Sequence, residues 1–130
     1  MNKVKKVLIA MFGLLMFPLL FACSNSQSQG IEAIKAKGKL VVALNPEFAP
    51  FEYQKLVDGK NQIVGSDVEL AKAIAKELGV EVEFSPMSFD NVLASLDSGK
   101  ADLAISGVSK TEERSQVYDF SIPYYTSKNK

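Results

Sequence analysis

The hydrophobic pattern of residues 31–126 alternates between short apolar runs and amphipathic stretches. Residues 40–44 form an unbroken apolar run, ended by Asn45-Pro46, which is typical of a strand buried on both faces. Residues 80–84 alternate strictly between apolar and acidic positions, which indicates a strand nearer the edge of the sheet. Residues 103–105 predict a short buried strand, and residues 117–120 predict a return to strand.

Apolar residues at helical spacing follow these strands. We expect a helix that starts at Ser66 or Asp67 as its N-cap, runs to Leu78 and stops at Gly79. One face of it is apolar: Val68, Ala71, Ile74, Ala75 and Leu78. A second helix is expected from Ser88 to Gly99.

Three shorter elements complete the pattern. Residues 31–37 predict a short helix that Gly38 ends, and Thr111 is the expected cap of a helical turn through Ser115. A hairpin is expected where residues 51–53 and 62–64 flank a turn at residues 58–61. The alternation of strand and helix predicts an α/β fold with a mostly parallel sheet and flanking helices.

Ligands bind such sheets beyond the carboxyl ends of the strands, which here selects the loops at residues 45–51, 85–90 and 106–114. In the third loop, Ser109 and Thr111 offer hydroxyl groups beside a helical turn whose backbone N–H groups favour an anion. Gly107 permits close approach to the backbone. Arg114 presents a planar fork that suits a carboxylate. On these residues alone two interpretations stay open: a carboxylate site, or an N-cap at Thr111 with Arg114 as a solvated surface charge.

Aromatic residues lie in the other two loops. Phe48 and Phe51 follow the first strand, and Phe89 follows the second. Such a ring packs on an apolar ligand stem or over an ammonium group, a contact worth about 0.5–2 kcal/mol. The alternative is a place in the core, which we favour for Phe51 because it begins the next apolar segment. Both interpretations stay open for Phe48 and Phe89.

Composition excludes several kinds of chemistry. The 130 residues include 15 Lys+Arg, 15 Asp+Glu, one Cys and no His. The lack of His excludes the HExxH zinc helix and the Ser-His-Asp triad, and a lone Cys excludes a cluster of Cys ligands. A net charge of zero argues against a nucleic-acid-binding domain. We expect no metal, no cofactor and no nucleic-acid partner.

The start of the chain alters these totals. Three lysines precede the uncharged residues 7–21, which as a helix span about 22 Å and fall short of the roughly 30 Å hydrocarbon core. This pattern predicts a signal peptide at residues 1–22, and a membrane-anchor helix is the less favoured alternative. Its removal leaves an acidic mature chain with a net charge of −3.

The residues before Cys23 resemble a bacterial lipobox, with the sequence Leu-Phe-Ala-Cys at residues 20–23. The resemblance implies that Cys23 receives a diacylglyceryl group and becomes the new N-terminus. The alternative is a stray Cys in an ordinary signal peptide. The polar residues 24–30 would extend the lipidated Cys as a flexible tether, so that the tether spans residues 23–30. We expect an exported protein, lipid-anchored on the outer face of the cytoplasmic membrane, at the cell surface or in the periplasm.

Four motifs stand in the order seen in family 3 solute-binding proteins, the polar-amino-acid receptors of ABC importers, which the chain resembles from residue 31 to 126. They are NPEFAPFE at residues 45–52, GSDVELA at 65–71, ADLAISGVSKTEER at 101–114 and DFSIPYY at 119–125. The resemblance implies the N-terminal lobe of a periplasmic-binding-protein type II fold. It also implies ABC permease subunits as partners, and we expect a monomer.

The resemblance gives roles to the residues of the third loop. Arg114 would hold the α-carboxylate of an amino acid, helped by Ser109. Backbone N–H groups at Gly107, Ser109 and Thr111 would assist. The carbonyl group of Ser106 or Gly107 would accept a hydrogen bond from the α-ammonium group.

For the ligand side chain, the resemblance implies a sandwich between Phe48 and Phe89. Asn45 stands where relatives that bind basic amino acids carry an acid. Because an amide supplies no counter-charge, Lys, Arg and His are less favoured ligands, although Glu47 would offer a substitute.

Receptors of this family have two lobes that close on the ligand, and we expect residues 127–130 to begin a truncated hinge. Without a second lobe the carboxylate site would be exposed, where an ion pair contributes only about 0–1 kcal/mol. We therefore expect weak or no amino-acid binding by this polypeptide alone. Two alternatives are a cyclohexadienyl-dehydratase-like enzyme, which the lack of His disfavours, and the sensing module of a membrane receptor, which the lipobox disfavours.

Overall fold

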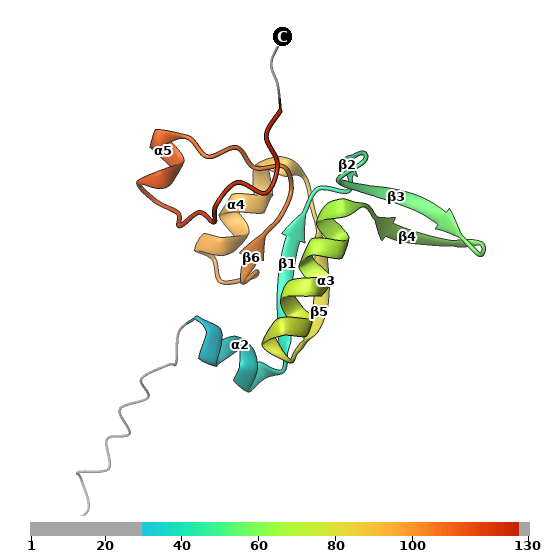
Figure 1. Ribbon diagram of the computed structural model, residues 1–130, viewed down its shortest axis with the longest axis horizontal. Helices are drawn as coiled ribbons and strands as arrows, with labels where there is room; N and C mark the ends of the chain where they lie inside the picture. Colours follow the sequence, from blue (N-terminus) through green and yellow to red (C-terminus); the bar gives the residue numbers. More distant parts are fainter. Residues whose placement is uncertain (1–29, 128–130) are drawn as a thin grey trace, which may run out of the picture.

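A three-stranded parallel sheet lies at the centre of the structure, a computed structural model that describes residues 30–127 (Figure 1). Its strand order is β5–β1–β6, with β1 (Lys39–Leu44) between β5 (Glu81–Pro86) and β6 (Leu103–Ala104). The predicted apolar run is this central strand, and all of its residues after Lys39 are buried. Within the described residues, the alternating strand β5 lies at an edge of the sheet, as its pattern predicts.

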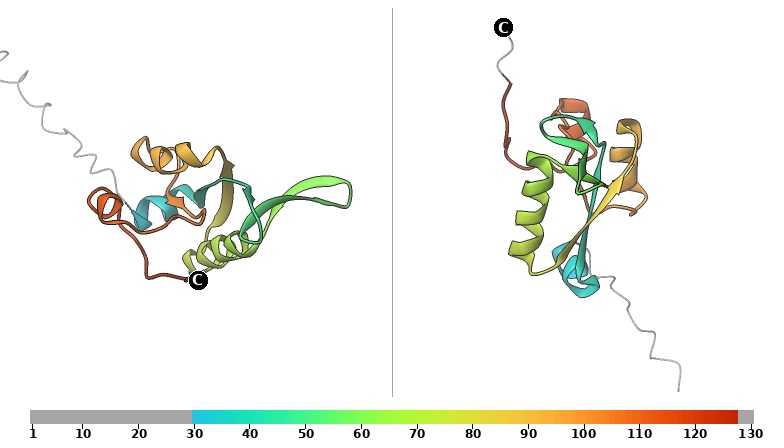
Figure 2. Two further views of the ribbon diagram at one scale, coloured as in Figure 1. Left: turned by 90° about the horizontal axis from the view of Figure 1, so that it is seen from above. Right: turned by 90° about the vertical axis from the view of Figure 1, so that its right-hand side faces the viewer.

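Helices cover both faces of the sheet. Figure 2 (right) shows α3 (Ser66–Leu78) on one side of the strands and α4 (Phe89–Asp97) on the other. Alternate side chains of β1 point to opposite faces and meet a different helix on each. The cluster on the α3 side comprises Leu40, Val42, Ala71, Ala75 and Ile105. The cluster on the α4 side comprises Val41, Ala43, Val92 and Ala101.

The helices end within one residue of the predicted positions, but the N-cap of α3 differs from the prediction. Gly38 ends α2 (Ile31–Lys37) and Gly79 ends α3, both in the left-handed conformation that glycine favours. The N-cap of α3, however, is Gly65, and neither Ser66 nor Asp67 caps it. A Cβ atom on Gly65 would lie 2.1 Å from the Phe51 carbonyl oxygen, so this helix start requires glycine. At the end of α4 the cap is Ser98, one residue before the predicted Gly99.

A second, antiparallel sheet projects from the first (Figure 1). Its strands are β2 (Glu47–Phe48), β3 (Glu52–Val57) and β4 (Lys60–Val64). The hairpin between β3 and β4 is confirmed, although its turn begins one residue earlier than predicted, because Val57 pairs with Lys60. Asp58 and Gly59 at its centre both have positive φ, at 49° and 76°, as a type I′ turn requires.

The strand predicted at residues 117–120 is wrong. The chain leaves α5 (Glu112–Ser115) and continues through residues 116–127 without regular structure. No strand of the described residues pairs with this segment, and its side chains anchor it instead, as when the Tyr118 hydroxyl donates to Asp97 Oδ2 at 2.7 Å. No helix among residues 30–127 has the length and apolar character needed to cross a membrane.

Candidate functional site

The three predicted loops meet at the carboxyl end of the parallel sheet, and Asn45 joins them. Its backbone N–H donates to Ser106 Oγ at 2.8 Å, and its side-chain Nδ2 donates to the Met87 carbonyl oxygen at 3.1 Å. One residue after β1 is thus bonded to the loop after β5 and to the loop after β6. Because parallel strands end at the same edge, the sequence order of these loops is sufficient to place them together.

A cavity of about 480 Å³ opens beside this junction. Three of the predicted site residues line it: Phe48, Gly107 and Ser109. Its remaining walls come from the same loops and from the C-terminal segment: Phe51, Val108, Lys110 and residues 120–127. The structure therefore unites the loop after β1 with the loop after β6 around one opening, and residues 120–127 contribute a wall that the sequence did not predict.

Aromatic rings form one side of the cavity. Phe48 and Phe51 are stacked, with ring centroids 5.2 Å apart, and Phe51 meets the ring of Tyr125 edge to face at 4.8 Å. Phe51 thus joins two exposed rings along the cavity wall, Phe48 at 51% and Tyr125 at 61% exposure. A Cβ atom on Gly107 would lie 2.8 Å from the Phe48 ring, so glycine at this position lets the ring contact the backbone of the loop.

Arg114 lies against the loop after β6. Its Nη1 donates to the Ser109 carbonyl oxygen at 3.0 Å, and Thr111 Oγ1 accepts from the Arg114 backbone N–H at 3.2 Å. The predicted N-cap is therefore present, and the Arg114 side chain folds back towards Ser109 instead of extending into solvent. Within residues 30–127, Arg114 forms no ion pair with an acidic residue. Its charge is consequently available to an anionic ligand beside Ser109.

Five predicted site residues do not line the cavity. They are Asn45, Phe89, Ser106, Thr111 and Arg114. Ser106 is buried, and its hydroxyl group bridges the Asn45 N–H and Glu52 Oε1. Phe89 is the first residue of α4 and is 42% exposed. Asn45, Ser106 and Thr111 shape the loops around the opening, whereas Arg114 lies next to it through Ser109.

The family described as bacterial extracellular solute-binding proteins, family 3, matches residues 40–130. The chain belongs to this family. The type II periplasmic-binding fold expected from the resemblance is confirmed, and the matched relatives include amino-acid-binding proteins of ABC transporters.

Relatives of this family include arginine-binding proteins. The arginine-binding extracellular protein ArtP of Bacillus subtilis is 44% identical over 108 residues, which cover 83% of this chain and 40% of ArtP. The substrate-binding protein AbpA of Streptococcus pneumoniae, solved with L-arginine, is 86% identical with a TM-score of 0.71, over 72% of this chain and 40% of AbpA.

An arginine-bound domain 1 of the Thermotoga maritima protein ArgBP is 47% identical with a TM-score of 0.66, over 71% of each chain. An ancestral amino-acid-binding protein described as a precursor of cyclohexadienyl dehydratase also matches. This chain spans about two fifths of the length of the curated relatives it matches first. Those relatives include extracellular-binding proteins, which supports export of this one.

A group of buried polar residues that the sequence did not predict lies beneath the loops of the candidate site. Glu52 of β3 is 0% exposed and Asp67 of α3 is 1% exposed. The Tyr124 hydroxyl donates to Asp67 Oδ2 at 2.9 Å, and Ser106 Oγ donates to Glu52 Oε1 at 2.7 Å. The available signal was an acid at an inward position of each element: Glu52 between two aromatic residues, and Asp67 beside the apolar stripe of its helix.

Burial raises the pKa values of Glu52 and Tyr124. The pKa of Glu52 is raised to about 7, chiefly by desolvation; the Ser106 hydrogen bond lowers it and the neighbouring Asp67 raises it. Desolvation and the hydrogen bond to Asp67 also raise the pKa of Tyr124 above its ordinary value. At neutral pH the tyrosine is a hydrogen-bond donor, and Glu52 is near its titration midpoint.

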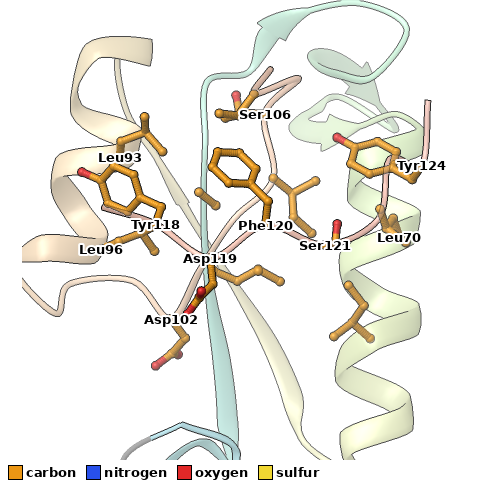
Figure 3. Close-up of a pocket in the computed structure, with 15 residues that line it drawn as sticks. Leu70, Leu93, Leu96, Asp102, Ser106, Tyr118, Asp119, Phe120, Ser121 and Tyr124 are labelled. Atoms are coloured by element: carbon orange, nitrogen blue, oxygen red, sulfur yellow. The ribbon is translucent and has the colours of Figure 1, made fainter. Parts of the chain in front are cut away.

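A second cavity, of about 230 Å³, lies along β6 between α3 and α4. Figure 3 shows Tyr118 beside Leu93 and Leu96, and Phe120 beneath Ser106. Aliphatic side chains from both helices and aromatic rings from residues 118–124 line most of this space. The C-terminal segment forms one wall of this cavity and β6 forms another. Ser106 is the single predicted site residue among the lining residues.

Proposed function

We propose that residues 31–126 form the amino-acid-capturing lobe of an extracytoplasmic ABC-importer receptor, and that its ligand is arginine or a closely similar cationic amino acid. The observation that carries this proposal is the cavity lined both by the exposed Phe48 ring and by the loop to which Arg114 is bonded. A guanidinium group stacks favourably on such a ring. An α-carboxylate is matched by an arginine beside a helix start and by the Ser109 hydroxyl group.

The amide of Asn45 supplies no counter-charge, and a cationic ligand was therefore expected to be less favoured. The hydrogen bond that this amide forms in the structure weakens that argument. The Asn45 amide donates to the Met87 carbonyl oxygen and ties two loops together. A side chain engaged in this way does not decide the charge of the ligand. The arginine-bound relatives, including one 86% identical, support arginine as the first ligand to test.

A single lobe leaves the ligand site exposed, and this exposure lowers its affinity for the ligand. The cavity is open to solvent, so an ion pair formed there is screened by water. We expect a dissociation constant for L-arginine above about 0.1 mM in the full 130-residue chain. The arginine-bound domain 1 of the Thermotoga maritima relative supports measurable binding by one lobe.

Isothermal titration calorimetry of the full chain with L-arginine tests the proposal. We expect Arg114→Gln and Phe48→Ala each to weaken binding at least about fivefold, which corresponds to about 1 kcal/mol. Arg114→Gln probes the carboxylate contact and Phe48→Ala the side-chain contact. Lys35→Gln, on the exposed surface of α2, is the matched control for loss of one positive charge. Equal binding of L-arginine and L-alanine would contradict the cationic ligand.

A catalytic function is not supported by the site. The chain contains no His, and the carboxyl group with a strongly raised pKa in the described residues, Glu52, is fully buried. A general acid has to reach the proton that it transfers. Turnover of prephenate by the full chain would favour the dehydratase alternative, and we expect none.

The lipid anchor and the permease partner are further parts of the proposal. Residues 1–22 would be the signal peptide, residues 23–30 the tether from the lipid on Cys23, and residues 127–130 the start of the hinge. Cys23 lies outside the described residues. Metabolic labelling with a radioactive fatty acid tests the anchor: we expect label in the wild-type chain and none after Cys23→Ala.

A further inference from the structure

Four segments converge on two buried carboxyl groups below the candidate site. Glu52 comes from β3 and Asp67 from the first turn of α3. Ser106 donates to Glu52, and Tyr124 donates to Asp67. The Gly107 backbone N–H adds a long hydrogen bond of 3.4 Å to Asp67 Oδ2. Figure 3 shows Ser106 on the loop after β6 and Tyr124 on the C-terminal segment, so the pair connects both walls of the candidate site.

One oxygen atom of each carboxyl group is buried without a hydrogen-bond partner among residues 30–127: Glu52 Oε2 and Asp67 Oδ1. No lysine or arginine of this range forms an ion pair with either residue. The two carboxyl groups are neighbours: Ser106 donates to Glu52, the adjacent Gly107 N–H donates to Asp67, and Asp67 contributes to the raised pKa of Glu52. Two buried negative charges without a cation are strongly disfavoured, and a single proton between the groups satisfies both remaining oxygen atoms at once.

We propose that Glu52 and Asp67 share one proton and act as positioning residues, which hold the loop at Ser106–Gly107 and the segment at Tyr124 in the arrangement that forms the candidate site. That these segments bind a ligand rests on the proposed function; that the pair holds them does not. A proton-linked clamp of this kind would make the geometry of the loop depend on pH.

Hydrogen bonds on either side of the Glu52–Asp67 pair connect its protonation state to the loop at Ser106–Gly107. Ser106 also accepts from the Asn45 N–H, and Gly107 contacts the ring of Phe48. The groups that face the pair are the Ser106 and Tyr124 hydroxyls and the Gly107 N–H, all of them neutral donors. When the pH rises through the pKa of Glu52, near 7, the pair gains a second negative charge. Repulsion then separates the carboxylates and loosens the loop.

Carbon-13 NMR of the full chain, labelled at the Glu and Asp side chains, tests the shared proton. We expect the Glu52 carboxyl signal to titrate near pH 7 and the Gly107 amide signal to shift with the same midpoint. In Glu52→Gln the amide group donates to Asp67 permanently, so the Gly107 signal should no longer move between pH 5.5 and 8.5. Glu81→Gln, an exposed glutamate on β5, is the matched control and should leave the Gly107 titration unchanged.

A Glu52 midpoint near 4.5, or a Gly107 signal that titrates equally in Glu52→Gln, would overturn the proposal. Glu52→Leu adds a further comparison: if the carboxyl group merely filled space, Glu52→Gln and Glu52→Leu would both leave the loop undisturbed. We expect only Glu52→Leu to shift the Ser106 and Gly107 amide signals at pH 6.

Binding measurements separate this inference from the proposed function. We expect the dissociation constant for L-arginine to rise at least threefold between pH 6 and pH 8 in the wild-type chain and to stay constant in Glu52→Gln. An equal rise in both would count against the clamp. Absence of arginine binding at either pH, with the coupled Gly107 titration intact, would refute the proposed ligand and support the shared proton.

Discussion

Acidic side chains serve opposite purposes at the two ends of the parallel sheet. At the amino end, Asp102 accepts from Lys37 Nζ at 2.6 and 2.7 Å and from the Val41 N–H at 2.8 Å. This pair is partly exposed, and its charges neutralise each other. At the carboxyl end, Glu52 and Asp67 are fully buried with no cation beside them. Only the second arrangement depends on a proton.

Acidic residues therefore have different roles at the two ends of the sheet. The ion pair at the amino end attaches α2 to the start of β6 and requires nothing from the ligand side. The carboxyl end has the loops of the candidate site, and their support is a network whose members are all polar. A buried polar network is costly when any member is lost, because the remaining groups are left without partners.

The largest effect is expected at Gly65, where the neighbouring backbone leaves no space for a side chain. Gly65→Ala places a methyl group 2.1 Å from the Phe51 carbonyl oxygen, at a φ of 133° that other residues rarely adopt. We expect the free energy of unfolding to fall by about 3 kcal/mol or more, measured by urea denaturation. Gly38→Ala is the control at the amino end: its added Cβ atom meets nothing within 4 Å, so only the strain of its positive φ remains. Equal losses in the two variants would remove the contrast.

The next effect is the pH dependence of stability. The pKa of Glu52 in the folded chain, about 7, lies above its ordinary value of 4.5. Between these values the folded state binds more protons than the unfolded state, so the free energy of unfolding decreases as the pH rises. The stabilisation is complete below pH 4.5 and lost above about 7, with a total change of up to about 3 kcal/mol.

Thermal unfolding of the wild-type chain and of Glu52→Gln across pH 4.5–8 measures this change. We expect the difference in stability between the two to grow with pH in favour of Glu52→Gln. Asp102→Asn, at the other end of the sheet, should retain the wild-type slope between pH 6 and 8. Parallel curves for wild type and Glu52→Gln would show that the pair carries no proton.

The sequence predicted the sheet better than it predicted the site, and particular residues show why. The apolar run at residues 40–44 and the alternation at residues 80–84 are local signals that tertiary packing reinforces. The positions of Phe48, Gly107 and Ser109 around one cavity follow from the rule for carboxyl ends of parallel strands. The strand predicted at residues 117–120 failed because Tyr118 and Phe120 line a cavity beside α4 and β6 while Val117 is exposed, an arrangement that no local pattern reports.

The acid pair was missed for a different reason. Glu52 and Asp67 are fifteen positions apart, and each alone resembles a surface acid or a helix cap. Their significance arises only when β3 and α3 bring them together and Tyr124 arrives from a third segment. The two motifs that contain these residues, at residues 45–52 and 65–71, point to a family, while the physical role of the acids becomes visible only in the fold.

A smaller effect is expected from the Tyr124 hydroxyl group. Tyr124→Phe leaves the ring in place and removes one donor from Asp67 Oδ2, which keeps only the long contact to Gly107. We expect a loss of about 1–2 kcal/mol in the free energy of unfolding, measured by urea denaturation at pH 6. Tyr125→Phe is the control, because Tyr125 contributes its ring edge to Phe51 and is largely exposed. A loss in Tyr125→Phe as large as in Tyr124→Phe would argue against a specific bond to Asp67.

The smallest effect is expected at the amino end of the sheet. Asp102→Asn keeps an acceptor for the Val41 N–H and removes the charge that attracts Lys37. Because both side chains are partly exposed, the free energy of unfolding should fall by only about 0.5–1 kcal/mol at low salt. Half a molar sodium chloride should reduce the difference further by screening. The proton-dependent change at Glu52 should survive the same salt, because a pair shielded from water is screened much less, and this contrast separates the two ends of the sheet in a single titration.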